Sequence, residues 1–171
     1  MTSSVPPLAQ HVQRLEAVYR DIAATSMRGL PVLHPGLSVL AIGFEPVPTE
    51  PGVALGVLVT PWFMNLLRLP LDEAATQAVL PVGVKAERDG GTHRFEFIGA
   101  QVPAFGAFEM ASLFSPMAEF ADQAAAVATA REVLALLRPV DAVAAPAPTA
   151  AAPVPSRRGF LFGRAAAGDR R

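Results

Sequence analysis

The chain of 171 residues contains no cysteine. This absence excludes disulfide bonds, thiolate-bound zinc, an iron–sulfur cluster held by the chain itself and a cysteine nucleophile. Histidine is scarce too, and His11, His34 and His93 lie far apart without the spacing of a metal site. We therefore expect a protein that binds neither a metal nor another cofactor.

Charge is also scarce. Charged residues make up 17% of the chain, hydrophobic residues make up 51%, and the formal net charge is −1. This balance gives no electrostatic reason to bind nucleic acid or an anionic membrane. The apolar content and the length favour one domain with a well-filled core. The N-terminal stretch MTSSVPPLAQHVQRLE lacks the apolar core of a signal peptide.

One uncharged stretch has to be compared with a membrane span. Residues 51–67, PGVALGVLVTPWFMNLL, reach the lower limit of the about 17–25 residues that a membrane helix needs. Pro61 and Asn65 interrupt this stretch, and Arg68 follows it at once. Two strand-like pieces around a turn fit this pattern better than one continuous helix, so no membrane insertion is expected.

Periodicity predicts an α+β domain over residues 8–140. Apolar residues recur at helical spacing from Leu8 to Met27, and again from about Glu119 to Arg138. Between them, Gly and Pro separate six short extended runs, at residues 38–44, 53–60, 66–69, 82–87, 94–98 and 107–114. We expect an antiparallel β-meander bracketed by the two helices, with both helices on one face of the sheet.

The C-terminal part has a different composition. Residues 141–155, DAVAAPAPTAAAPVP, have the Ala/Pro pattern of an extended linker, and residues 156–171 form a short basic tail with aromatic residues. Five arginines and Asp169 give this tail a formal charge of +4, which leaves −5 for the rest of the chain. The two parts are therefore expected to attract one another.

Enzyme signatures fail on residue type, so no catalytic activity is expected. No glycine-rich phosphate loop follows a strand, and the serines at 112 and 115 lack the flanking glycines of a nucleophile elbow. His34 could act as a general base, but no partner is evident in the sequence, and a histidine that stabilises a turn is the more ordinary interpretation.

Aromatic and methionine side chains form two clusters along the chain. Pro61-Trp62-Phe63-Met64 contains the single tryptophan, and Phe105, Phe108, Met110, Phe114 and Met117 form the second cluster. Flexible and aromatic side chains can adapt to varied apolar peptides, which indicates a binding groove. The alternative is that many of these residues are ordinary core, because buried Phe and Met are common.

Four stretches in order resemble the [NiFe]-hydrogenase assembly chaperones of the HybE/HupJ type. They are His34-Pro35, residues 60–65 (TPWFMN), residues 112–117 (SLFSPM), and Arg157-Arg158 followed by residues 161–164 (LFGR). The resemblance implies a non-catalytic, cytoplasmic accessory protein that contacts the small or large subunit precursor of a hydrogenase before export. Some relatives act beside a rubredoxin, so a scaffold that protects the hydrogenase together with a rubredoxin is the alternative function.

The tail sequence PSRRGFLFGR is similar to a twin-arginine export signal at the wrong end of the chain. Since the exported small subunit in this family bears such a signal, the tail could imitate the client in the groove, or the match could be coincidence. Guanidinium groups pair with carboxylates in a bidentate manner, which makes Glu109 and Glu119 candidate partners for the arginines. The candidate partner-binding residues are Pro61, Trp62, Phe63, Met64, Phe108, Met110, Phe114, Met117, Glu109, Glu119, Arg157, Arg158, Phe160 and Phe162.

Overall fold

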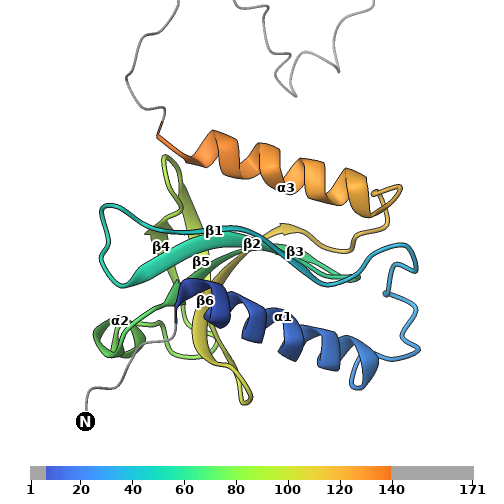
Figure 1. The fold of residues 1–171 in the computed structure, drawn as a ribbon, viewed down its shortest axis with the longest axis horizontal. Coiled ribbons are helices and arrows are strands. Elements are labelled where there is room, and N and C mark those ends of the chain that lie inside the picture. Colours follow the sequence, from blue (N-terminus) through green and yellow to red (C-terminus); the bar gives the residue numbers. More distant parts are fainter. Residues whose placement is uncertain (1–6, 140–171) are drawn as a thin grey trace, which may run out of the picture. The chain divides into compact units, whose positions relative to one another are not determined.

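A computed structural model describes residues 7–139 of the chain, as a helix, a six-stranded antiparallel sheet and a C-terminal helix (Figure 1). The fold class predicted from the sequence is confirmed. The elements in chain order are α1 (Leu8–Ala24), β1 (Leu40–Pro46), β2 (Val53–Val59), β3 (Met64–Pro70), α2 (Glu73–Gln77), β4 (Lys85–Asp89), β5 (Arg94–Val102), β6 (Gly106–Phe114) and α3 (Gln123–Leu137).

The sheet consists of two three-stranded meanders joined edge to edge. Its strand order is β1-β2-β3-β6-β5-β4, and every neighbouring pair is antiparallel. The central pair β3–β6 joins residues about forty positions apart, such as Arg68 and Glu109. After β3 the chain therefore crosses to the far edge through α2 before it returns strand by strand. The sequence predicted the strands but not this order.

The two helices cover opposite faces of the sheet, so the expectation that both lie on one face is wrong (Figure 1). Leu15 and Tyr19 of α1 pack with Leu67 and Leu69 of β3, whereas α3 packs on the face that carries Leu66. Side chains alternate across a strand, and every residue of β3 is buried. A strand that is apolar on both sides requires a cover on both faces of the sheet.

Small residues let α3 approach the sheet closely. Its buried positions are Ala126, Ala130, Leu134 and Leu137. The helix begins after Asp122, whose carboxylate accepts a hydrogen bond from the Ala125 N–H at 2.8 Å. It therefore starts about four residues later than periodicity predicted, because the preceding residues form the turn that contains this N-cap.

The β4–β5 hairpin holds the other end of α3. The Thr92 N–H donates to the Leu137 carbonyl at 2.7 Å, and the Thr92 hydroxyl donates to the Leu136 carbonyl at 2.9 Å. Gly91 has a φ of 93°, and a Cβ there would lie 2.0 Å from the Leu137 oxygen. Only glycine fits this approach, which explains the Asp-Gly-Gly sequence of the turn.

The free edge of β1 is closed by side chains from both helices. The Ala41 N–H donates to Glu16 of α1 at 2.7 Å, and Arg138, at the end of α3, donates to the Gly43 carbonyl at 2.8 Å. Exposed strand edges invite pairing with another chain. These two contacts satisfy backbone groups that β2 does not reach.

The predicted linker, residues 141–155, and the predicted basic tail, residues 156–171, lie outside the described residues, and the domain boundary at residue 140 stays a prediction. Within residues 7–139, no helix has the length and apolar character needed to cross a membrane. Residues 51–67 instead form β2, a turn and the first half of β3, as expected from the interrupting proline.

Candidate functional site

Three of the four segments that carry the family resemblance meet at one end of the sheet. They are residues 34–35, 60–65 and 112–117, which lie far apart in sequence. Leu40 pairs with Val59, Val59 pairs with Met64, and Met64 pairs with Phe114. The start of β1, the β2–β3 turn and the end of β6 therefore lie side by side, on the right in Figure 1. We call this region the loop end and define it as residues 29–36, 60–63 and 115–120.

His34 connects the three segments of the loop end. Its backbone N–H donates to the Pro61 carbonyl at 2.8 Å, and its Nδ1 accepts from the Gly36 N–H at 3.0 Å. Since Nδ1 is an acceptor, Nε2 carries the proton and donates to the Phe120 carbonyl at 2.8 Å. Both ring nitrogens are thus occupied by the backbone. His34 stabilises a turn, and the alternative of a general base has no support in this geometry.

Thr60 shapes the turn that presents the tryptophan. Its hydroxyl oxygen accepts from the Trp62 N–H at 3.2 Å and from the Phe63 N–H at 2.9 Å. The backbone N–H of Thr60 donates to the Phe63 carbonyl at 2.8 Å. A threonine turn of this kind joins β2 to β3. It leaves Trp62 and Phe63 half-buried at the surface.

The half-buried aromatic side chains rest on α1. The Phe63 ring meets the Tyr19 ring edge-on at a centroid distance of 5.8 Å, and the Trp62 ring lies 6.4 Å from Tyr19. Burial raises the pKa of Tyr19 to about 12, so its phenol stays neutral at physiological pH. The loop end is therefore supported by a rigid, uncharged aromatic base.

The surface of the loop end is apolar and has almost no charge. Leu30 and Val32 are 44% and 43% exposed. No Asp, Glu, Lys or Arg occurs in residues 29–44, 51–67 or 110–118, so Glu119 is the single charged residue of the loop end. Exposed apolar side chains bordered by polar residues are typical of interaction sites.

The expectation that the aromatic and methionine residues of the two clusters line an open groove is wrong for three of them. Met64, Phe108 and Met117 are fully buried. Phe108 packs on the α1 face, whereas Met64 and Met117 pack on the α3 face, so the cluster is divided between two cores. Alternation along the strands separates side chains that are close in sequence.

The remaining predicted residues differ in exposure. Pro61 is buried, and Trp62, Phe63, Met110 and Phe114 are half-buried. Phe114 packs edge-on against Phe120 at 5.1 Å on the α3 side. Contact of these side chains with a partner stays a prediction. Arg157, Arg158, Phe160 and Phe162 lie outside the described residues.

The two predicted carboxylates have different surroundings. Glu119 is exposed at the loop end. Glu109 is buried, and its carboxylate accepts from Arg68 Nε at 3.2 Å and from the Leu80 N–H at 3.0 Å. Glu109 is therefore already paired within the domain, which contradicts its expected position as an open partner for an incoming arginine.

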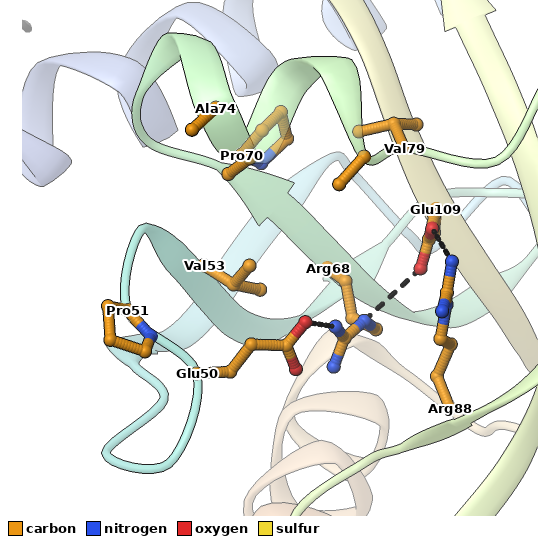
Figure 2. Close-up of a pocket in the computed structure, with 11 residues that line it drawn as sticks. Glu50, Pro51, Val53, Arg68, Pro70, Ala74, Val79, Arg88 and Glu109 are labelled. Atoms are coloured by element: carbon orange, nitrogen blue, oxygen red, sulfur yellow. Dashed lines mark hydrogen bonds and ion pairs between the residues drawn. The ribbon is translucent and has the colours of Figure 1, made fainter.

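A cavity that the sequence did not predict lies at the other end of β3, below α2 (Figure 2). It has a volume of about 300 Å³. The floor is formed by Arg68 and Glu109, which are 4% and 5% exposed, with Glu50 and Arg88 at the rim. The wall is aliphatic and includes Pro51, Val53, Pro70, Ala74, Ala75, Ala78 and Val79.

Arg68 is the centre of the polar part of this cavity. It also donates to the Asp89 carbonyl at 2.8 Å and forms an ion pair with Glu50. Figure 2 shows Glu50 and Glu109 reaching Arg68 from opposite sides. An arginine inside the apolar run Leu66-Leu67-Arg68-Leu69 was the one signal in the sequence that could have revealed the cavity.

Among the described side chains, no three His, Asp or Glu residues gather in a way that could hold a metal ion. Neither the loop end nor the cavity combines a nucleophile with a base in hydrogen-bonding reach. The arrangement can bind apolar groups at the loop end and polar groups in the cavity.

Known proteins resemble this chain over most of its length. A family model described as [NiFe]-hydrogenase assembly, chaperone, HybE matches residues 10–163. Protein HoxT from Cupriavidus necator is 49% identical over 160 residues, which cover 90% of this chain and 88% of that protein. A protein named probable rubredoxin HupJ, from Rhodobacter capsulatus, is 37% identical over 123 residues, which cover 72% of this chain and 43% of that protein.

One solved structure has a similar fold. The solution structure of HybE from Escherichia coli matches with a TM-score of 0.53 at 20% identity, and the match covers 92% of this chain and 91% of that one. At this identity the likeness concerns the fold alone.

Proposed function

Because the chain belongs to the family of [NiFe]-hydrogenase assembly chaperones described as HybE, we propose that it binds the precursor of a hydrogenase subunit and holds it before export. The family predicted from four short motifs is confirmed, and the chain is a chaperone of hydrogenase assembly. The proposal adds the client state, a precursor in the cytoplasm, and a mode of action without catalytic turnover.

The observation that carries the proposal is the convergence of the family motifs at the loop end. Three motifs far apart in sequence would not need to meet at one surface if each only filled the core. Here they join through His34 and leave Leu30, Val32, Trp62 and Phe63 at or near the surface. A neutral, apolar surface fits an apolar client segment better than a charged one.

We propose that this client segment is the signal region of the small-subunit precursor. A twin-arginine signal combines an apolar stretch with two guanidinium groups. Its apolar part would lie on the loop end, and Glu119 is the exposed carboxylate at the border of that surface. Glu109 has no part in this proposal, because it is paired with Arg68.

The test is capture of the small-subunit precursor by the tagged chain, with and without the signal sequence. We expect capture of the complete precursor and at least a tenfold weaker signal without the signal sequence, because the apolar contact supplies most of the binding free energy. Equal capture of both forms would contradict recognition of the signal region.

Trp62→Ala and Phe95→Ala form a matched pair for the same experiment. Both side chains are half-buried aromatics on the sheet, but only Trp62 belongs to the loop end. We expect Trp62→Ala to weaken precursor capture and Phe95→Ala to leave it unchanged at a similar loss of thermal stability. If both variants lose capture in proportion to their melting temperatures, Trp62 acts through stability alone.

A second candidate function is action beside a rubredoxin-type protein, which the name of the Rhodobacter capsulatus relative favours. This chain contains no cysteine and cannot supply thiolate ligands for iron. A rubredoxin would therefore have to be a separate partner. This function would be favoured over the first if the chain captured the precursor equally with and without the signal sequence and also captured a folded hydrogenase subunit.

A further inference from the structure

The cavity below α2 combines an ionic floor with an aliphatic wall. Arg68 and Glu109 lie at its bottom, and Pro70, Ala74 and Val79 face them across the cavity (Figure 2). Its volume of about 300 Å³ is at the lower end of the range for small-ligand pockets. A ligand that fills it must present one polar group to the floor and an apolar stem to the wall.

Arg68 and Glu109, which form the floor, already make hydrogen bonds within the domain. Arg68 donates from Nε to Glu109, from Nη1 to the Asp89 carbonyl and from Nη2 to Glu50. Both oxygens of Glu109 accept hydrogen bonds, one from Arg68 and one from the Leu80 N–H. The charge of Arg68 is therefore neutralised from both sides by Glu109 and Glu50.

Arg88 is different, because one of its N–H donors has no acceptor among the described residues. Its Nη2 contacts Glu109 at 3.4 Å, the longest ion-pair contact of Glu109, and its Nε is buried without a hydrogen-bond partner among the described residues. A buried donor without a partner destabilises the fold, and a ligand that accepts from it removes that cost. The side chain as a whole is 35% exposed, and it already lines the cavity.

We propose that this cavity binds a single carboxylate on a short aliphatic stem, with Arg88 as its anchor. The Nε and Nη2 edge of a guanidinium presents two parallel N–H groups, which match the two oxygens of a carboxylate. The stem lies against Val53, Pro70 and Val79. The site takes a monoanion, because Glu50 and Glu109 neutralise Arg68, and the buried Nε of Arg88 is a donor without a partner among the described residues.

This binding site is independent of precursor capture at the loop end, from which it is separated by the length of β3. Two sources supply the same chemistry: a free short-chain monocarboxylate, and a carboxylate of a bound polypeptide. The probes are therefore pentanoate, its neutral analogue pentanamide, and one short apolar peptide with either a free or an amidated C-terminus.

The experiment is a titration of the full-length chain, followed through the backbone amide NMR signals of Ala75, Val79 and Leu80, which border the cavity. We expect saturable shifts with pentanoate in the millimolar range and none with pentanamide. Arg88→Gln should weaken pentanoate binding at least tenfold. Arg94→Gln, which removes an exposed arginine from the same hairpin, should leave it unchanged.

The outcomes separate the two sources and the structural alternative. Saturation by the free-acid peptide but not by its amide assigns the site to a polypeptide carboxylate, and saturation by pentanoate alone assigns it to a small molecule. Equal binding of pentanamide, unchanged binding in Arg88→Gln, or no saturable shift with any probe would overturn the proposal and leave the cluster a structural ion-pair network. Arg88→Lys, which keeps the charge but not the two-donor edge, should bind pentanoate with intermediate affinity.

Discussion

The two ends of β3 differ in which side chains they expose to water and which they bury. At the loop end, beside Met64, apolar side chains stay exposed and Glu119 is the single charged residue. At the cavity end, beside Pro70, charged side chains are buried and paired with one another. Exposed apolar surface costs free energy that a partner can recover, whereas buried charge costs free energy that internal partners have to recover. The comparison supports our proposals that a macromolecular partner binds at the loop end and that a small carboxylate binds in the cavity.

The largest effect is expected from Arg68→Met, which breaks the buried network at the cavity end. Glu109 would remain buried without its main cation, and such a loss costs about 3–5 kcal/mol. Urea unfolding measures the change. The double variant Arg68→Met/Glu109→Leu should be more stable than Arg68→Met alone, since no buried carboxylate is left without its main cation. A double variant that is less stable than the single one would show that Glu109 stabilises the fold even without Arg68, through Leu80 and Arg88.

A smaller effect is expected from His34→Ala at the loop end. The change removes the hydrogen bonds to the Gly36 N–H and the Phe120 carbonyl, at a cost of about 1–3 kcal/mol in the free energy of unfolding. It should also weaken precursor capture, because the three loops lose their common anchor. His93→Ala, at an exposed histidine, is the control and should change stability by less than about 0.5 kcal/mol. Full capture by His34→Ala would separate the turn from the binding surface.

The smallest effect concerns pH at the cavity end of the molecule. His11 stacks on Phe105 at 4.7 Å, and burial, followed by the nearby Arg14, lowers its pKa below 6.5. Protonation of His11 is therefore less favourable in the folded state than in the unfolded state. The stability contributed by neutral His11 is complete above pH 6.5 and is lost as the pH falls from there toward the folded-state pKa.

The measurement is urea unfolding at pH 7.5 and pH 5.5. His11→Phe keeps an aromatic ring against Phe105 but cannot titrate, so its stability should fall less between these two pH values than that of the unchanged chain. An equal fall in both proteins would assign the pH dependence to other groups.

The sequence predicted the elements well because each one depends on local signals. Gly and Pro separate the six strands, and the position of every strand is confirmed to within a few residues. The short helix α2 was missed, because five residues are too few to show a helical period.

Long-range features could not be predicted in the same way. An amphipathic stripe shows which side of a helix is buried, but not which face of the sheet it covers, and so α1 and α3 were placed on the same face. The burial of Phe108 and Met117 depends on long-range packing into two different cores, and the Arg68–Glu109 pair joins residues 41 positions apart. Neither the burial of these two side chains nor this ion pair can be predicted from spacing along the sequence.

The most direct test of the loop end as the client surface compares two valines of nearly equal exposure. Val32 is 43% exposed in the loop end, and Val84 is 45% exposed next to the opposite edge strand β4. An aspartate at either site should leave the fold intact. We expect Val32→Asp to weaken the affinity for the small-subunit precursor at least tenfold, or about 1.4 kcal/mol, and Val84→Asp to leave it unchanged. Equal affinities for both variants, or a loss with Val84→Asp alone, would contradict the account.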